Sequence, residues 1–182
     1  MNNNILIVVD VQNDFIDGSL ANPVAQERVG NIVEKIKNFK GDVILVTRDT
    51  HAEDYLETNE GKKLPVVHCV KGTQGWYINK DVADALHEKE LSETCMVRYF
   101  DKPTFGSEEL AKAVKEYEGQ LDIEIVGYCT DICVVSNALM VKAAVYDRAN
   151  VSVIENCCAG VTPESHEAAL TTMSFCQINV VR

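Results

Sequence analysis

Six short apolar runs, separated by stretches with helical periodicity, constrain the fold of this chain more than any other feature of its sequence. A continuous apolar run is typical of a parallel strand that is covered on both faces. Alternation of such strands with helices favours a three-layer αβα fold around a parallel sheet. We therefore predict a Rossmann-like α/β fold whose six parallel strands lie in the order 3-2-1-4-5-6. The predicted strands are residues 5–9, 43–46, 95–98, 123–126, 151–154 and 178–181.

Five segments carry apolar residues at helical spacing, namely residues 24–39, 81–90, 108–117, 134–146 and 163–173. Apart from one of these helices, the stretch 48–92 reads as irregular. Loops of that length in a compact domain are usually functional, so this stretch is a candidate lid. The length of 182 residues suits one domain, and the sequence shows no linker or internal repeat. We expect a single domain that spans residues 1–182.

Composition and charge narrow the class of protein. The formal net charge of −11 argues against a surface that follows nucleic-acid phosphates. No stretch approaches the roughly 20 apolar residues of a membrane span, and the N-terminus lacks the basic region of a signal peptide. The seven cysteines are odd in number and have no framework spacing, which indicates reduced thiols. These features predict a cytoplasmic protein without a nucleic-acid or membrane partner.

Polar residues follow the predicted strands at the points where the strands end. Asp10 follows the first strand, Asp49 and His51 follow the second, Lys102 follows the third and Cys133 follows the fourth. Because the carboxyl ends of parallel strands share one edge, ligands bind there at the point where the strand order reverses. In the predicted order the first and fourth strands are neighbours at that point. We therefore expect Asp10 to face Cys133, with Lys102 approaching from the far side.

Cys133 falls just inside the start of a predicted helix. Gly127 permits a tight turn before it, and Thr130 or Asp131 can cap the first helical turn. Free N–H groups and the helix dipole at this position favour a thiolate and can stabilise an oxyanion. The alternative is that Cys133 is a small apolar residue packed at a helix end.

A thiol, a carboxylate and an ammonium make a workable set for covalent catalysis. Asp10 can take the proton of Cys133 and later deliver it to a departing amine. Lys102 can hold Asp10 and balance the charge of the site. Taken singly, Asp10 could instead cap the next helix and Lys102 could be a solvated surface residue.

A second group of residues has the composition of a metal site. In an extended segment Asp49 and His51 project to the same side, so both can bind one ion. His68 can join them, with Glu60 or Glu57 as a further oxygen ligand. Mixed nitrogen and oxygen ligands suit Zn²⁺, Mn²⁺ or Fe²⁺. The alternative is a hydrogen-bonded Asp–His pair without metal.

Aromatic residues lie in or near the same loops, namely Phe15, Trp76, Phe100, Phe105 and Tyr128. Some of them could wall a pocket for a flat ring, while core packing is the alternative for each.

Four motifs in this order resemble the isochorismatase-like cysteine hydrolase family: VVDVQNDF at 8–15, TRDTH at 47–51, KPTF at 102–105 and GYCTDICV at 127–134. The resemblance spans nearly the whole chain and implies a six-stranded α/β fold, found in homo-oligomers. It implies a catalytic triad of Cys133, Asp10 and Lys102. It also implies a cis peptide between Tyr128 and Cys129, which would turn the Cys129 N–H inward to form an oxyanion hole with the N–H of Cys133.

Within this family the chain is most similar to the nicotinamidase branch. Asp49, His51 and His68 match the metal site of that branch, and Glu60 is similar to a fourth ligand found in some members. The implied cofactor is a divalent metal, with zinc first and manganese or iron as alternatives. Many nicotinamidases have Trp and Pro where this chain has Thr50 and Ala52, which weakens the inference about substrate.

The resemblance implies hydrolysis of a small-molecule amide through a thioester, with nicotinamide as the first expectation for the substrate. We expect Phe15, Phe105 and Tyr128 to line the substrate pocket. An N-carbamoyl or ureido amidase is the alternative hydrolase, and its carboxylate-bearing substrate would require Arg48 or Arg98 in the pocket. A non-catalytic α/β ligand-binding module is the alternative from another class. It would favour a GxGxxG turn after a strand, which this sequence lacks.

Overall fold

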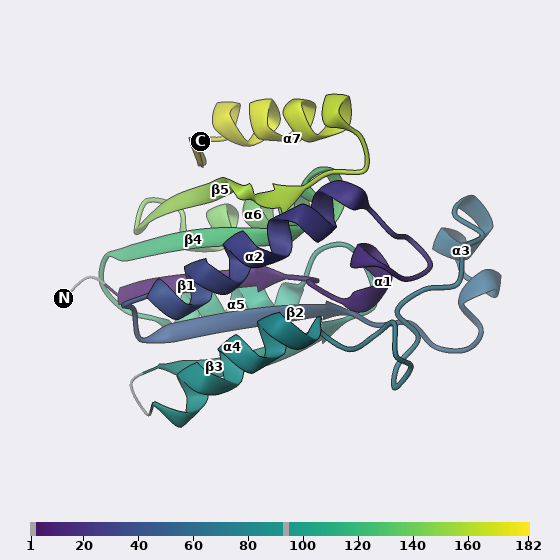
Figure 1. The fold of residues 1–182 in the computed structure, drawn as a ribbon. Helices are drawn as coiled ribbons and strands as arrows, with labels where there is room; N and C mark the ends of the chain where they lie inside the picture. The colour runs from purple at the N-terminus through teal and green to yellow at the C-terminus, as the bar shows by residue number, and fades with distance from the viewer. Residues whose placement is uncertain (1–2, 93–94) are drawn as a thin grey trace.

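The computed structural model describes residues 3–92 and 95–182, and these form three layers (Figure 1). The central layer is a six-stranded sheet in the order β3-β2-β1-β4-β5-β6, with every neighbouring pair parallel. This architecture confirms the predicted fold class and strand order. The strands are β1 (Asn3–Val9), β2 (Val43–Asp49), β3 (Met96–Lys102), β4 (Leu121–Tyr128), β5 (Ala149–Ala159) and β6 (Asn179–Val181).

The sequence located β1 better than β5, which continues five residues past its predicted end at 154, and better than the edge strand β3. Every side chain of β1 from Ile5 to Val9 is fully buried, which explains its unbroken apolar run. β3 lies at the edge of the sheet, where Arg98 and Asp101 are partly exposed. These polar residues interrupt the apolar pattern without ending the strand, so β3 continues four residues past the predicted end at 98.

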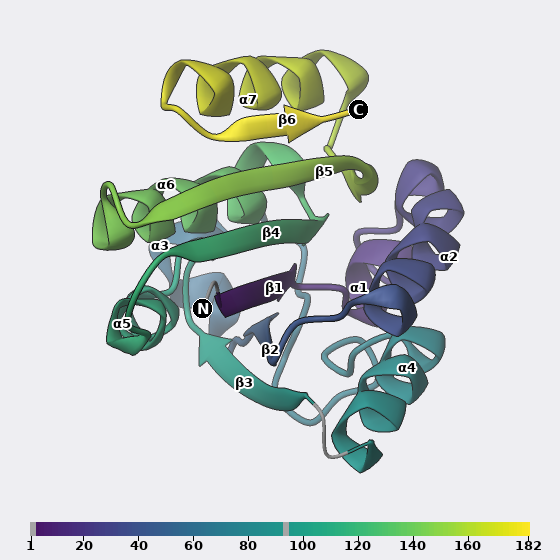
Figure 2. The same ribbon diagram turned by 90° about the vertical axis from the view of Figure 1, so that its left-hand side faces the viewer.

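Helices cover both faces of the sheet, with α2 and α4 on one side and α5 and α6 on the other (Figure 2). Ile5, Ile7 and Val9 of β1 belong to the apolar cluster that includes α5 and α6. Leu6 and Val8 belong to the cluster on the opposite face, with α2 and α4. The longer helices are α2 (Pro23–Asn38), α4 (Lys80–Leu91), α5 (Glu108–Glu116), α6 (Val135–Val145), which follows the π-helical turn η2 (Thr130–Val134), and α7 (Pro163–Phe175). Within the described ranges, no helix combines the length and apolar character needed to span a bilayer.

Three short helical segments lie beyond the carboxyl ends of the strands (Figure 1). They are α1 (Asn13–Ile16), η1 (Tyr55–Glu57) and α3 (Asn59–Lys63). The stretch predicted as irregular, 48–92, contains η1 and α3 and ends in α4. It folds over the edge of the sheet at which the predicted site residues lie.

The start of the helix after β4 differs from the prediction. Its N-cap is Cys129, and no side chain caps the first turn. Thr130 instead pairs its hydroxyl with Nδ1 of His166 at 2.8 Å, and the Asp131 carboxylate accepts hydrogen bonds from the N–H of Val161. Both predicted capping residues therefore join the helix start to the region of α7, because the π-helical turn directs their side chains away from its own N–H groups.

Candidate functional site

Three side chains with titratable groups meet at the carboxyl edge of the sheet. Asp10 directly follows β1, Lys102 is the last residue of β3 and Cys133 lies in η2. The Nζ atom of Lys102 lies 2.6 Å from Oδ2 of Asp10 and 3.5 Å from Sγ of Cys133. All three side chains are buried. The Lys102 ammonium therefore contacts both the carboxylate and the sulfur.

The orientation of Asp10 is set by its backbone and by Thr47. Asp10 has a φ of 48°, a left-handed conformation that side chains other than glycine rarely adopt. Its N–H donates to the carbonyl of Thr47 at 3.2 Å, and its Oδ1 accepts a 2.7 Å hydrogen bond from the Thr47 hydroxyl. One carboxylate oxygen is thus held by Thr47, while the other faces Lys102.

Burial and mutual charge determine the protonation of this group. Burial raises the pKa of Asp10 above the usual carboxyl range, although Lys102 opposes this shift. Burial and the Asp10 charge raise the pKa of the Cys133 thiol well above its usual range, against the smaller opposing effect of Lys102. Burial lowers the pKa of Lys102, but the surrounding negative groups, Asp10 first, outweigh it and raise the value overall. The helix start alone therefore does not make Cys133 a thiolate, contrary to the sequence expectation.

The segment before Cys133 has the backbone geometry that the family resemblance implied. The peptide bond between Tyr128 and Cys129 is cis. The carbonyl of Cys129 accepts hydrogen bonds from the N–H groups of Ile132 and Val134, at 3.1 and 3.0 Å. These bonds hold the turn that carries Cys133 on the end of β4.

The four predicted metal ligands also meet. Oδ2 of Asp49 lies 3.1 Å from Nε2 of His51 and 3.4 Å from Nε2 of His68. Oε1 of Glu60 lies 3.7 and 3.8 Å from the same two nitrogens. One donor atom from each residue lies within 4.8 Å of all the others. The alternative ligand Glu57 is exposed and does not belong to this cluster.

The protonation pattern of the cluster fits a divalent metal ion. Nδ1 of His68 lies 2.8 Å from the carbonyl oxygen of Val66, so its proton occupies that side and Nε2 offers a lone pair to the cluster. Oδ1 of Asp49 is buried and, within the described part of the chain, accepts no hydrogen bond. Two nitrogen and two oxygen donors suit Zn²⁺, Mn²⁺ or Fe²⁺.

A cavity of about 550 Å³ connects the two groups of residues. It reaches Cys133 on one side and Asp49, Glu60 and His68 on the other. Apolar side chains supply most of the remaining wall: Phe15, Leu20, Leu64, Phe105, Ile132 and Val161. A volume of this order suits a small organic ligand, and its position brings that ligand within reach of the thiol.

The aromatic residues predicted near the pocket fall into two groups. Phe15 and Phe105 line the cavity as expected. Tyr128 does not line it, which corrects the prediction: its ring is fully buried and its hydroxyl donates to the carbonyl of Ala25 in α2 at 2.7 Å. Trp76 and Phe100 belong to the two core clusters.

Two polar residues that the sequence analysis missed position the metal cluster: Gln12 is buried and Asp14 is partly buried. Gln12 bonds to the backbone of Asp49, and Oδ2 of Asp14 accepts a 2.7 Å hydrogen bond from the N–H of Cys69, next to His68. Both lie in the first motif. Polar residues interleaved with the buried Val11 and Phe15 just beyond β1 were a signal for them, since polar groups held among buried residues need hydrogen-bond partners.

A third missed residue, Asn137, braces Cys133 from α6. It is fully buried, and its Nδ2 donates to the carbonyl of Cys133 at 2.8 Å and to that of Phe105 at 3.0 Å. Its Oδ1 accepts from the N–H of Ser107. An asparagine in an otherwise apolar helix indicates such a buried hydrogen-bond network.

Two known proteins with related sequences match most of the chain. A nicotinamidase of Schizosaccharomyces pombe is 28% identical over 208 residues, which cover 97% of this chain and 91% of the relative. A nicotinamidase of Saccharomyces cerevisiae is 26% identical, covering 74% of this chain and 79% of the relative.

Two solved structures illustrate the similarity in fold. The pyrazinamidase of Pyrococcus horikoshii, solved in complex with zinc, matches with a TM-score of 0.78 and 28% identity, covering 98% of each chain. A nicotinamidase/pyrazinamidase of Bacillus subtilis matches with a TM-score of 0.81 and 24% identity, covering 99% of this chain and 100% of that one. At 24% identity, the similarity to the Bacillus subtilis structure shows a shared fold only.

The isochorismatase domain family matches residues 4–182. The match includes all of the motifs on which the resemblance was based, and the strand order agrees with that of the solved relatives. The chain therefore belongs to the isochorismatase family.

Proposed function

We propose that this protein is a cysteine amidohydrolase that converts nicotinamide to nicotinate and ammonia. The observation that carries the proposal is the contact of Lys102 Nζ with both Asp10 and Cys133 at the wall of the ligand-sized cavity. A buried carboxylate, ammonium and thiol in contact are costly unless they serve chemistry. The two related nicotinamidases support the choice of substrate.

In the proposed reaction Asp10 accepts the proton of Cys133 as the sulfur attacks the amide carbonyl carbon. The N–H groups of Cys129 and Cys133 stabilise the oxyanion that forms. The C–N bond then breaks, Asp10 protonates the departing ammonia, and the acyl group remains on the sulfur as a thioester. Asp10 next takes a proton from water as that water attacks the thioester. The C–S bond then breaks, the acid is released, and Asp10 returns the proton to the sulfur to restore the thiol. Lys102 holds Asp10 in place throughout.

The proposed cofactor is a divalent metal ion, zinc in the first place, with manganese or iron as alternatives. Asp49, His51, Glu60 and His68 would hold it. When bound, such an ion supplies a Lewis acid that can attract the lone pair of a heteroaromatic nitrogen. The zinc in the Pyrococcus horikoshii structure supports this choice.

The alternative of an N-carbamoyl amidase has less support. Its substrate carries a carboxylate and would require a cationic pocket residue. Arg48 is occupied by an ion pair with Asp101 at 2.7 Å and lies over the Trp76 ring, while Arg98 lies over Phe100. Neither arginine is among the described residues that line the cavity, which favours an uncharged amide.

Ammonia release from a panel of compounds tests the substrate assignment. Nicotinamide, pyrazinamide and N-carbamoyl amino acids are supplied to the metal-loaded protein. We expect turnover of the two heteroaromatic amides, and preference for the carbamoyl compounds would contradict the proposal. Cys176→Ala is the matched control, because Cys176 is an exposed cysteine outside the site and its loss leaves turnover unchanged.

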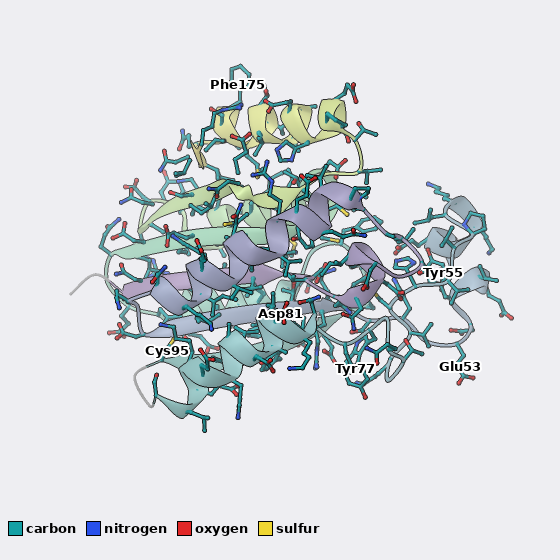
Figure 3. The ribbon with its side chains drawn as sticks, viewed as in Figure 1. Glu53, Tyr55, Tyr77, Asp81, Cys95 and Phe175 are labelled. Carbon is teal, nitrogen blue, oxygen red and sulfur yellow. The ribbon has the colours of Figure 1, made fainter. Side chains whose placement is uncertain are left out.

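We further propose that the chain is one domain acting as a cytoplasmic homo-oligomer, with neither nucleic acid nor membrane as a partner. The seven cysteines, all among the described residues, are free thiols, which supports a reducing compartment. Figure 3 shows Phe175 on the outer side of α7, where 87% of the residue is exposed. Phe175 is the most exposed of the large hydrophobic residues in the described part of the chain, so it is the residue we choose to probe the proposed assembly. Sedimentation of the wild type and of Phe175→Ser tests the oligomer, since a monomeric wild type would contradict it.

A further inference from the structure

Tyr55 is a buried aromatic residue that contacts both histidines of the metal cluster. Its ring centroid lies 4.6 Å from that of His51 and 4.9 Å from that of His68. Figure 3 shows Tyr55 beyond the carboxyl edge of the sheet, in the region of α3. Its hydroxyl is engaged by a backbone carbonyl, so its part in the site is to pack its ring against the ligands.

Tyr55 also holds both ends of α3. At the N-terminal end, the Thr58 hydroxyl donates to the carbonyl of Tyr55 at 2.7 Å and accepts from the N–H of Gly61 at 3.0 Å. At the C-terminal end, the Tyr55 hydroxyl donates to the carbonyl of Leu64 at 3.0 Å. Between these points a Cβ on Gly61 would lie 2.1 Å from the Tyr55 carbonyl oxygen, so α3 packs directly on the Tyr55 backbone.

The position of α3 matters because it carries Glu60 and leads to Leu64. Glu60 presents its carboxylate to both histidines, and Leu64 lines the cavity. α3 has five residues, which is too short for a helix to be stable without tertiary anchors. Its anchors therefore determine where both side chains lie.

We propose that Tyr55 is the positioning residue for the fourth metal ligand: its ring packs against both imidazoles, and its hydroxyl fixes α3 so that Glu60 completes the metal site and Leu64 closes the cavity wall. The inference rests on the proposed metal site. It assigns to the Tyr55 hydroxyl an effect on metal affinity that is exerted through Glu60.

A double-mutant cycle on metal binding tests this inference. The metal-stripped wild type, Tyr55→Phe, Glu60→Gln and the double variant are titrated with Zn²⁺ alone against a competing chelator. Tyr146→Phe is the matched control, because Tyr146 is exposed and belongs to neither group of site residues. The free energies of unfolding of the metal-free proteins are compared to confirm that the fold is intact.

We expect Tyr55→Phe to weaken Zn²⁺ binding by about tenfold, as for other residues that support metal ligands, and Tyr146→Phe to leave it unchanged. In the Glu60→Gln background the same substitution should cause no further loss. At saturating Zn²⁺ the kcat of Tyr55→Phe should return to the wild-type value. Wild-type affinity in Tyr55→Phe, or an equal loss in both backgrounds, would overturn the role of Tyr55 and leave the metal site standing. A wild type that binds no Zn²⁺, Mn²⁺ or Fe²⁺ would overturn the metal site and this inference together.

Discussion

The side chain of Gln12 makes hydrogen bonds to both the N–H and the carbonyl group of Asp49. Oε1 accepts from the N–H at 2.7 Å, while Nε2 donates to the carbonyl at 2.8 Å and to the carbonyl of Trp76 at 2.8 Å. Gln12 is fully buried. The side-chain amide of Gln12 thus pairs with the backbone of Asp49 as an adjacent strand would. It thereby joins the loop after β1 to the metal cluster.

Gln12→Ala should lower the free energy of unfolding by at least about 2 kcal/mol, because it leaves three buried backbone groups without a partner. It should also weaken metal binding, since the Asp49 backbone loses its support. Urea unfolding and Zn²⁺ titration measure the two effects. Gln120→Ala removes an exposed glutamine and should leave both unchanged. Equal stability of the two variants would contradict this account of Gln12.

Lys102→Met should lower the free energy of unfolding by about 3–5 kcal/mol at neutral pH, because it leaves the buried Asp10 carboxylate without its cation. The loss should depend on pH. Burial already raises the pKa of Asp10, and removal of Lys102 raises it further. A carboxyl whose pKa is raised in the folded state binds its proton more tightly there, so the variant keeps most of its stability at low pH and loses it as the pH rises through the folded-state pKa.

Denaturant unfolding of Lys102→Met over a series of pH values measures this effect. The double variant Asp10→Asn, Lys102→Met has no carboxyl at this position and should lose the added pH dependence. Lys112→Met removes only an exposed ion pair with Glu108 and serves as the surface control. A destabilisation by Lys102→Met that is the same at every pH would show that Asp10 is not its cause.

Metal binding should raise the thermal midpoint of the protein. A ligand that binds only the folded state at about 100 times its Kd adds roughly 2.7 kcal/mol of stability. His51→Ala should abolish the shift because it removes one of the four clustered donors. His87→Ala removes an exposed histidine and should retain it. Calorimetry with and without Zn²⁺, together with elemental analysis, checks this, and an equal shift in His51→Ala would contradict the ligand assignment.

Two glycine substitutions should have opposite effects on stability. Gly127 has a φ of 123°, and a Cβ there would lie 2.0 Å from the carbonyl oxygen of Val9 in the neighbouring strand. Gly127→Ala should therefore destabilise the fold by more than about 1 kcal/mol. Gly30 lies within α2, and a Cβ there meets nothing within 4 Å, so Gly30→Ala should stabilise by about 0.5–1 kcal/mol. Thermal unfolding of both variants checks the signs, and a neutral Gly127→Ala would contradict the close approach of β4 to β1.

The sequence predicted the grouping of Asp10, Lys102 and Cys133 for one physical reason. In a parallel sheet the carboxyl ends of the strands meet, so residues that directly follow apolar runs are brought together without knowledge of the loops. The metal cluster required more, because His68 and Glu60 come from a stretch without strong periodicity. Their grouping was expected chiefly from the resemblance to the family.

The features that the sequence did not predict depend on short helices or on contacts between distant segments. α1 and α3 are too short to produce a periodic pattern, so neither was predicted. Tyr128 was misplaced because β4 continues through it: Tyr128 lies two residues after Val126, on the same face of the strand, and packs in the same core cluster. The partners of Gln12 and Tyr55 became visible only once the chain was folded.

Ammonia release from nicotinamide by Cys133→Ala tests the covalent mechanism most directly. The variant is compared with the wild type at saturating amide and equal metal content, after its thermal midpoint has been shown to match. The account predicts a fall in kcat of at least about 10⁴-fold, because the variant lacks the sulfur that Lys102 contacts and that forms the thioester. A kcat within tenfold of the wild type would contradict it.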